Sequence, residues 1–165
     1  MIVYLVGMPG SGKSTVGREL AGRLGVPFID LDSEIEREAG RSVPEIFAAE
    51  GEAAFRALEA QALVKASMQD PAVVACGGGV VLEQANRITL RATGICVFLD
   101  VPLEVLHQRV TPAEDRPLIR AEGDLDRLLA AREPLYREFA AHVVDGVGEP
   151  GEVARSIEEE LRWSA

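Results

Sequence analysis

The sequence GMPGSGKS at residues 7–14 matches the pattern G-x-x-x-x-G-K-[ST] at every position. Its glycines let the backbone curl so that N–H groups point inward at phosphate oxygens. Lys13 is placed to reach the β- and γ-phosphates of a nucleotide, and the Ser14 hydroxyl can ligate Mg²⁺. The stretch therefore predicts a phosphate-binding loop (P-loop).

The segments on either side have the secondary structure that this motif requires. Ile2–Val6 is a short apolar run rich in β-branched residues, as in a buried parallel strand. From Ser14 to Leu24, apolar residues recur at helical spacing. A helix that starts at the loop directs its positive end at the same phosphates. The order strand, glycine loop, helix argues against a chance glycine-rich turn.

Composition limits the partners of this chain. Its 165 residues suit one globular domain, and 17 basic against 27 acidic residues give a net charge of −10. So acidic a chain is a poor candidate for nonspecific binding to nucleic acid or to an anionic membrane. An anionic ligand must then be held by a local group of basic side chains, which makes individual arginines informative.

Several features predict a reduced, cytoplasmic protein that acts as a monomer. The first strand starts at residue 2 with no basic region before it, and no apolar run approaches the roughly 20 residues of a membrane span. Cys76 and Cys96 lie in or beside apolar runs, which favours buried thiols over a disulfide or a metal site. No sustained exposed apolar stripe suggests a subunit interface.

Strand-like and helical segments alternate along the chain. This alternation predicts an α/β protein with a parallel sheet, helices on both faces and ligands at the carboxyl ends of the strands. The predicted strands are Ile2–Val6, Pro27–Ile29, Ala72–Ala75, Ile95–Leu99 and His142–Val144, and the predicted helices are about 14–24, 33–39, 52–69, 82–91, 102–109, 124–140 and 151–162. The polar segment Thr111–Asp124 interrupts the pattern, as a surface loop or as a mobile lid over the site.

Three aspartates are candidates for metal binding or acid–base chemistry. Asp30 and Asp32 follow the second predicted strand, where one could hold a Mg²⁺ water and the other could accept a proton from a substrate hydroxyl. Alternatively, Asp32 or Ser33 caps the next helix, with a capping-box partner at Glu36. Asp100 ends an apolar strand, which is typical of a metal-binding aspartate but equally of a helix cap.

Glycines and arginines mark a second group of candidates. Gly77-Gly78-Gly79 follows the third predicted strand and suggests close approach of the backbone to a ligand. Arg56, Arg116 and Arg132 would each be an ordinary surface charge in most proteins, and Arg56 could simply pair with Glu52 or Glu59. An anionic substrate gives them a shared purpose, because the guanidinium group matches carboxylate and phosphate geometry.

Taken together, these segments resemble the shikimate kinase family. The resemblance rests on the P-loop, Phe28-x-Asp30-x-Asp32, Ile46-Phe47, Gly51-Glu52-x-x-Phe55-Arg56-x-x-Glu59, Gly77-Gly78-Gly79, Arg116-Pro117-Leu118 and Arg132-x-Pro134-x-Tyr136. It implies a three-layer α/β/α P-loop kinase fold with a five-stranded parallel sheet in the order 2-3-1-4-5. The chain would form one domain, 1–165, with a substrate-binding helical segment at about 32–60 and a lid at about 111–124.

The resemblance also implies MgATP-dependent phosphorylation of the 3-hydroxyl of shikimate, in aromatic amino-acid biosynthesis. Lys13, Asp32 and Arg116 would be catalytic. ATP would contact Gly10, Ser11, Gly12, Lys13, Ser14, Thr15 and Arg116; shikimate would contact Asp32, Arg56, Gly78 and Arg132; Mg²⁺ would be held by Ser14 and by Asp30 through water. A gluconate-type kinase, a nucleoside monophosphate kinase and a noncatalytic nucleotide-binding protein are the alternatives.

Further expectations follow from the resemblance. Asp100 becomes structural, because the family's metal-side strand is the one that enters the triple glycine, and Glu59 becomes the residue that orients Arg56. The implied strand order puts Cys76 and Cys96 two strands apart, too far for a disulfide. The chain departs from the family pattern at Cys76, where members commonly have threonine, and in 146–151, which lacks a basic or amide side chain before Pro150-Gly151.

Overall fold

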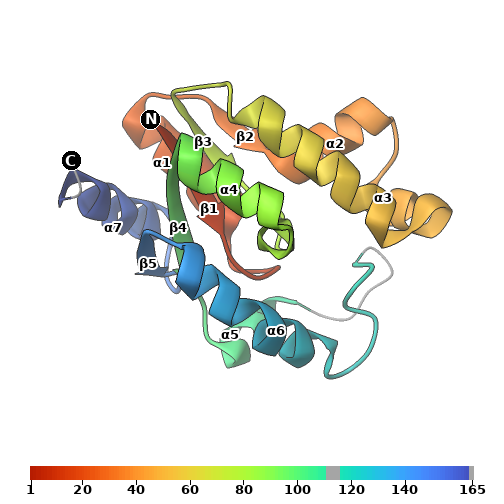
Figure 1. Ribbon diagram of the computed structural model, residues 1–165. Coiled ribbons are helices and arrows are strands. Elements are labelled where there is room, and N and C mark those ends of the chain that lie inside the picture. The colour runs from red at the N-terminus through yellow and green to blue at the C-terminus, as the bar shows by residue number, and fades with distance from the viewer. Residues whose placement is uncertain (111–115, 164–165) are drawn as a thin grey trace.

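The computed structural model describes residues 1–110 and 116–163, so residues 111–115 of the predicted lid lie outside it. Within these residues, each of the five strands is followed by one or two of the seven α-helices (Figure 1). The strands are β1 (Ile2–Val6), β2 (Phe28–Asp30), β3 (Ala72–Ala75), β4 (Gly94–Asp100) and β5 (His142–Asp145). The helices are α1 (Lys13–Leu24), α2 (Leu31–Ala39), α3 (Val43–Ala66), α4 (Gln84–Thr93), α5 (Leu103–Arg109), α6 (Asp124–Phe139) and α7 (Pro150–Trp163), with a 3₁₀ turn η1 at Val80–Leu82.

The strands form one parallel sheet in the order β2-β3-β1-β4-β5, which confirms the predicted topology. β1 lies at the centre, with Tyr4 opposite Val74 of β3 on one side and Cys96 of β4 on the other. All carboxyl ends therefore meet at one edge, where the P-loop, Asp30 and the triple glycine emerge. This edge is where ligands bind in open α/β sheets.

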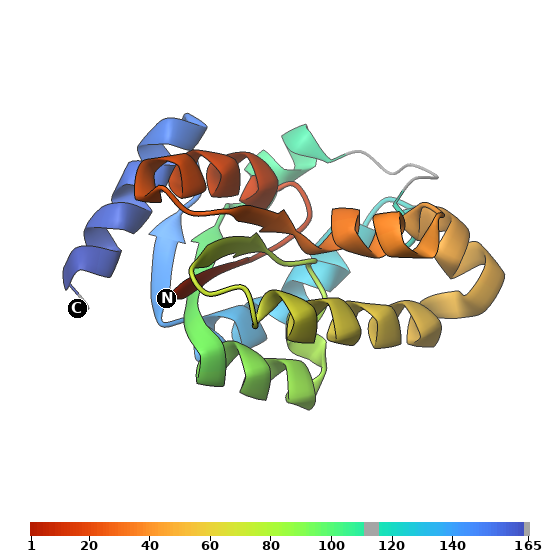
Figure 2. The ribbon, with the colours of Figure 1, turned by 90° about the horizontal axis from the view of Figure 1, so that it is seen from above.

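Side chains of β1 alternate between two apolar cores, one on each face of the sheet. Val3 and Leu5 face α1 and α7, whereas Ile2, Tyr4 and Val6 face the core that α3, α4 and α6 complete. Figure 2 shows the two helical layers on opposite sides of the sheet. Every β1 side chain is buried, as expected for the central strand of a parallel sheet.

The largest error of the sequence-based reading concerns α3, which begins at Val43 and not near residue 52. Gly51 (φ 85°, ψ 176°) interrupts the helix, so its first half looks like a loop in sequence. Ser42 caps this half by accepting a hydrogen bond from Glu45 N at 3.2 Å. The Ser42–Glu45 spacing is itself a helix-start signal that could have revealed it.

The start of α2 also differs from the prediction. Asp30 is the N-cap, and its Oδ1 accepts a hydrogen bond from Ser33 N at 3.2 Å, so the cap assignment to Asp32 or Ser33 was wrong. The expected capping box with Glu36 does not form, because Glu36 Oε2 accepts from Val43 N instead. The Asp32 side chain therefore does not cap α2. The end of α3, at Ala66, lies three residues before the predicted end, and the remaining predicted boundaries fall within two residues of the observed ones.

Both cysteines are buried free thiols, as predicted. Cys76 directly follows β3 and donates its backbone N–H to Leu5 O, whereas Cys96 lies within β4. In the part of the chain that the structure describes, no helix is long and apolar enough to cross a bilayer.

Candidate active site

The P-loop connects β1 to α1 and is held by its own backbone and by Lys13. Lys13 Nζ donates hydrogen bonds of 2.8 Å to the carbonyl oxygens of Gly7 and Met8. Gly10 and Gly12 have φ values of 81° and 91°, which favour glycine. A Cβ on Gly10 would lie 2.3 Å from a methyl group of Val110, so the loop has no room for a side chain there.

Burial of the Lys13 ammonium lowers its pKa to about 8, because desolvation penalises the charged form. The negative charge of Asp32 opposes this effect but does not cancel it. Nucleotide phosphates would add negative charge near Nζ and thereby favour the charged form. Lys13 therefore has the position and the electrostatics of a phosphate-binding cation.

Ser14 and Asp30 lie side by side at the start of α1 and the end of β2. Ser14 Oγ donates a hydrogen bond of 2.5 Å to Asp30 Oδ2. In residues 1–110 and 116–163, no three His, Cys, Asp or Glu side chains gather as a metal site. Mg²⁺ often takes one or two protein oxygens and completes its shell with phosphates and water. The Ser14–Asp30 pair fits that requirement.

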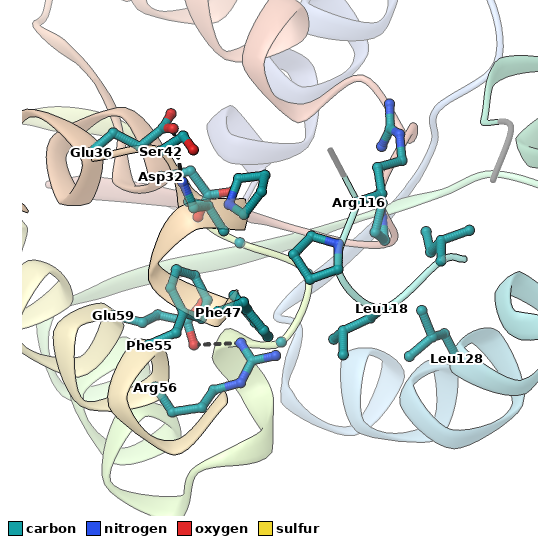
Figure 3. Close-up of a pocket in the computed structure, with 18 of the residues that line it drawn as sticks. Asp32, Glu36, Ser42, Phe47, Phe55, Arg56, Glu59, Arg116, Leu118 and Leu128 are labelled. Atoms are coloured by element: carbon teal, nitrogen blue, oxygen red, sulfur yellow. Dashed lines mark hydrogen bonds and ion pairs between the residues drawn. The ribbon is translucent and has the colours of Figure 1, made fainter. Parts of the chain in front are cut away.

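Two cavities meet above the carboxyl edge of the sheet. The smaller, of about 430 Å³, contains the P-loop, Ser14 and Asp30. The larger, of about 500 Å³, lies between α2, α3, α6 and the segment 116–119 (Figure 3). Both are lined by Pro9, Asp32, Gly77, Gly78 and Arg116. The structure thus brings together a phosphate site and a second ligand site, with Asp32 and Arg116 at their boundary.

Asp32 projects from the first turn of α2 toward the triple glycine. Its Oδ1 is buried and has no hydrogen-bond partner among the residues that the structure describes. Burial raises the pKa of Asp32, and the nearby charge of Asp30 raises it further, while Lys13 lowers it. A buried acceptor without a donor needs one from a ligand, and a carboxylate with a raised pKa is a better proton acceptor.

Each glycine of 77–79 lies against a different charged side chain. A Cβ on Gly77 would lie 2.7 Å from Glu59 Oε2 and 3.1 Å from Asp32 Oδ1. A Cβ on Gly78 would lie 3.0 Å from Arg132 Nη1, and one on Gly79 would lie 2.3 Å from Arg56 Nη1. The triple glycine therefore leaves room for the charged groups of the larger cavity to approach the backbone.

Arg56 is buried and held by two carboxylates on its own helix, as predicted. Its Nη1 donates to Glu59 Oε1 at 2.9 Å, and its Nη2 donates to Glu52 Oε1 at 3.2 Å. Glu59 is fully buried, and Figure 3 shows this pair on one wall of the larger cavity. Burial raises the pKa of Glu59, which the Arg56 charge opposes. The pair fixes the direction of the guanidinium group.

Arg132 is also buried, only 4% exposed, but forms no ion pair within residues 1–110 and 116–163. One helical turn further, Tyr136 donates its hydroxyl to Gly78 O and stacks on Phe98 with ring centroids 5.1 Å apart. Burial raises the pKa of Tyr136 to about 12, so it remains a donor. A buried, unpaired guanidinium group strongly favours an anionic ligand.

Apolar side chains line the larger cavity on both sides: Figure 3 shows Phe47 and Phe55 beside Arg56 and Glu59, and Leu118 and Leu128 across from them. The apolar lining residues are Val43, Pro44, Phe47, Phe55, Pro117, Leu118, Ile119 and Leu128. Arg116 lies across the cavity from Arg56 and Glu59 (Figure 3). A ligand with a carboxylate end, a hydroxyl-bearing end and an apolar ring face matches these surroundings. Asp100 is remote from this chemistry, since it accepts a hydrogen bond of 2.7 Å from Arg137, as expected for a structural residue.

Sequence reasoning missed three contributors to the site. Arg109, at the end of α5, donates a hydrogen bond of 3.2 Å to Gly10 O and so holds the P-loop from outside. Glu36 and Ser42 line the larger cavity, and Glu36 fixes the start of α3. The contact of Arg109 links positions 99 residues apart, so no local pattern announces it.

Comparison with known proteins agrees with this geometry. The family model described as shikimate kinase matches residues 9–162. A shikimate kinase from Aromatoleum aromaticum is 47% identical and the match covers 98% of this chain and 95% of the relative; one from Halorhodospira halophila is 49% identical, with 97% and 93% covered. The solved shikimate kinase from Acinetobacter baumannii in complex with shikimate is 40% identical, with a TM-score of 0.95 and coverage of 99% and 93%. Because these matches span nearly the whole chain and the fold agrees along its length, the protein belongs to the shikimate kinase family.

Proposed function

We propose that this protein transfers the γ-phosphoryl group of ATP to the 3-hydroxyl of shikimate, with the smaller cavity as the donor site and the larger as the acceptor site. The observation that carries the proposal is the meeting of the two cavities at Asp32. A carboxylate there can orient an acceptor hydroxyl toward a phosphate held by the P-loop and accept its proton.

The acceptor site suits a small hydroxylated carboxylic acid. Arg132, buried and without an ion-pair partner in the described part of the chain, and Arg56, fixed by Glu59, would hold the carboxylate. Asp32 and the backbone of Gly78 would contact the hydroxyl groups. The apolar side chains of α3 and of segment 117–119 would cover the ring. This arrangement supports a substrate-binding segment at about 32–60.

On the donor side, the loop from Gly10 to Thr15 would surround the phosphates, and Lys13 would bind the β- and γ-phosphates. Ser14 and Asp30 would hold Mg²⁺, which when bound neutralises phosphate charge. Arg116 borders both cavities and would contact the phosphoryl group in transfer, which fits a lid arginine. The rest of the lid prediction falls on residues 111–115, outside the described residues. We further propose one domain that acts as a cytoplasmic monomer.

The decisive experiment is a direct assay of ADP release with MgATP and a panel of acceptors. The panel contains shikimate, quinate, gluconate and nucleoside monophosphates, and each product is identified by mass spectrometry. We expect turnover with shikimate far above that with the other acceptors. If gluconate or a nucleoside monophosphate were phosphorylated and shikimate were not, the proposed acceptor would be wrong.

A further inference from the structure

The first half of α3 forms a separate wall segment of the acceptor cavity. It lies between Gly40 (φ 65°), which ends α2, and Gly51 (φ 85°), which interrupts α3. Val43, Pro44 and Phe47 of this half line the larger cavity. The position of this wall relative to α2 therefore sets the width of the acceptor site.

Few polar contacts hold this wall segment. Arg41 pairs with Glu50, and Ser42 caps the helix, but both contacts lie within the segment itself. Apolar packing anchors it through buried Ile46 and through Phe47, whose ring centroid lies 4.8 Å from that of Phe55. This apolar packing does not by itself fix the direction of the first turn of α3, so other contacts must do so.

Glu36 supplies a polar contact from α2 to the start of the wall. Its Oε2 accepts a partly buried hydrogen bond of 3.0 Å from Val43 N, at the first residue of α3. The first N–H groups of a helix lack partners within the helix, and a negative charge beside them is favourable. Glu36 thus accepts a hydrogen bond from the Val43 N–H, which has no partner within its own helix.

Glu36 also shares a helix face with Asp32. The two residues are four positions apart on α2, so their side chains are neighbours, and both line the larger cavity. In Figure 3, Glu36 lies beside Ser42 at the rim, next to Asp32. Helix α2 therefore carries both the candidate base, Asp32, and the carboxylate of Glu36, which ties the start of α3 to α2.

We propose that Glu36 is a positioning residue for the acceptor: its bond to Val43 N fixes the wall of α3 relative to Asp32 and so sets shikimate binding. This inference rests on the proposed function. Glu36 lines the larger cavity but not the smaller one, where nucleotide would bind. Its loss should weaken acceptor binding and leave nucleotide binding unchanged.

The test compares three variants in the full-length protein. Glu36→Ala removes the acceptor oxygen, Glu36→Gln keeps an oxygen for Val43 N, and Glu34→Ala is a matched control on α2, where Glu34 pairs with exposed Arg37 at 2.6 Å. Shikimate affinity is measured by calorimetry, KM and kcat by ADP release, and exchange of the Val43 amide by NMR.

We expect Glu36→Ala to raise the shikimate Kd and KM about tenfold, the scale of losing a hydrogen bond to a charged group. The ATP KM and kcat should change less than about twofold, and the Val43 amide should exchange faster. Glu36→Gln should restore most of the affinity. Should Glu36→Ala fail to fold, Glu36→Gln with slow Val43 exchange and near-normal KM still supports the inference.

Three results would overturn the inference. Glu36→Ala could match Glu34→Ala in shikimate affinity, Glu36→Gln could lose as much affinity as Glu36→Ala, or ATP and shikimate affinities could fall together. Each leaves the proposed function standing as long as the wild-type protein phosphorylates shikimate. If the wild-type protein does not, the function itself fails first, so the two failures are distinguishable.

Discussion

The donor and acceptor cavities adjoin, yet they are built in different ways. On the donor side, one continuous stretch, residues 9–15, supplies the largest group of lining residues, including two glycines and Lys13. The acceptor side collects side chains from α2, α3, α6 and segment 116–119, which are far apart in sequence. The donor side therefore depends mainly on a local sequence motif that binds a phosphate chain. The acceptor side depends on residues that are far apart in sequence, and these determine the specificity for the acceptor.

The two sides also treat charge differently. Lys13 on the donor side bonds to carbonyl oxygens of its own loop, so its charge remains available for phosphates. On the acceptor side, Arg56 is already matched by Glu59, whereas buried Arg132 forms no ion pair within the described residues. The following substitutions separate the contributions of the two sides, from the largest expected effect to the smallest.

Asp32→Asn should break the chemistry while both ligands still bind. Asparagine keeps the size of the side chain but cannot accept a proton, so kcat should fall about 10³-fold, within the range of general-base catalysis. The ATP Kd should stay within about twofold. The matched control is Asp100→Asn at the end of β4, whose partner is Arg137. A near-wild-type kcat in Asp32→Asn would remove Asp32 from the chemistry.

Lys13→Met should break the donor side alone. Removing one preorganised cation from the phosphates should lower kcat about 10²-fold and weaken ATP binding, since such groups act mainly in the transition state. Shikimate binding without nucleotide should not change. Lys65→Met is the control, because Lys65 is exposed and pairs with Glu38 at 2.7 Å. A loss of shikimate affinity equal to that of ATP would show that the two sides are not separable.

Arg132→Ala should break the acceptor side alone. It removes a buried cation that forms no ion pair within residues 1–110 and 116–163, so the shikimate KM should rise about 30-fold, typical of a lost charged contact. The ATP KM should hardly change. Arg137→Ala on the same helix, where Arg137 is exposed and pairs with Asp100, is the control. An unchanged shikimate KM would contradict the role of Arg132 in carboxylate binding.

The same contrast explains what the sequence could predict. The donor side, the parallel sheet and most element boundaries were predictable, because they depend on local motifs and on the alternation of apolar segments. The strand order was predicted from the family resemblance. Local patterns made Asp30, Asp32, Arg56 and Arg132 candidates but left each of them open between structural and functional roles. The family resemblance then assigned a role to each. The residues that meet at the acceptor site are far apart in sequence, so their roles could not be predicted from local patterns.

Contacts that tertiary packing creates could not be predicted. The helix that was predicted to begin near residue 52 begins at Val43, and Gly51 interrupts it. Glu36 was assigned to a capping box with Ser33, whereas it bonds to Val43 N. No pattern indicated that Arg109 reaches Gly10 O. For Glu36 and Arg109 the deciding partner lies on another element, and its approach depends on the packed fold. The start of α3 differs, because the local Ser42–Glu45 spacing signals it.

Gly79→Ala tests whether the triple glycine serves the acceptor side. A Cβ there would lie 2.3 Å and 2.4 Å from the Nη atoms of Arg56, so the guanidinium group must move. Gly79 has a φ of −97°, which alanine can adopt, so the backbone should remain unstrained. We expect the shikimate KM to rise about tenfold at constant ATP KM. Gly22→Ala, with open space around its Cβ position, is the control.

The smallest expected effect is the pH dependence of nucleotide binding. The pKa of Lys13 is lowered to about 8 in the protein without nucleotide, chiefly by burial. Phosphates favour the charged form, so nucleotide binding above pH 8 must also bind a proton. At pH 8.5 roughly a quarter of Lys13 remains charged, and ADP affinity should be about fourfold weaker than at pH 7.

Lys13→Met distinguishes the titration of Lys13 from that of other groups, because the fourfold pH effect on ADP affinity should vanish in this variant. Stability of the free protein has the opposite sign. Between pH 8 and the ordinary lysine pKa of 10.5, the unfolded chain binds more protons than the folded one. The contribution of Lys13 to the free energy of unfolding therefore increases as the pH rises. Calorimetry of ADP binding and urea unfolding, each as the difference between wild type and Lys13→Met, measure both trends. Parallel curves for the two proteins in both measurements would mean that the Lys13 pKa is not lowered.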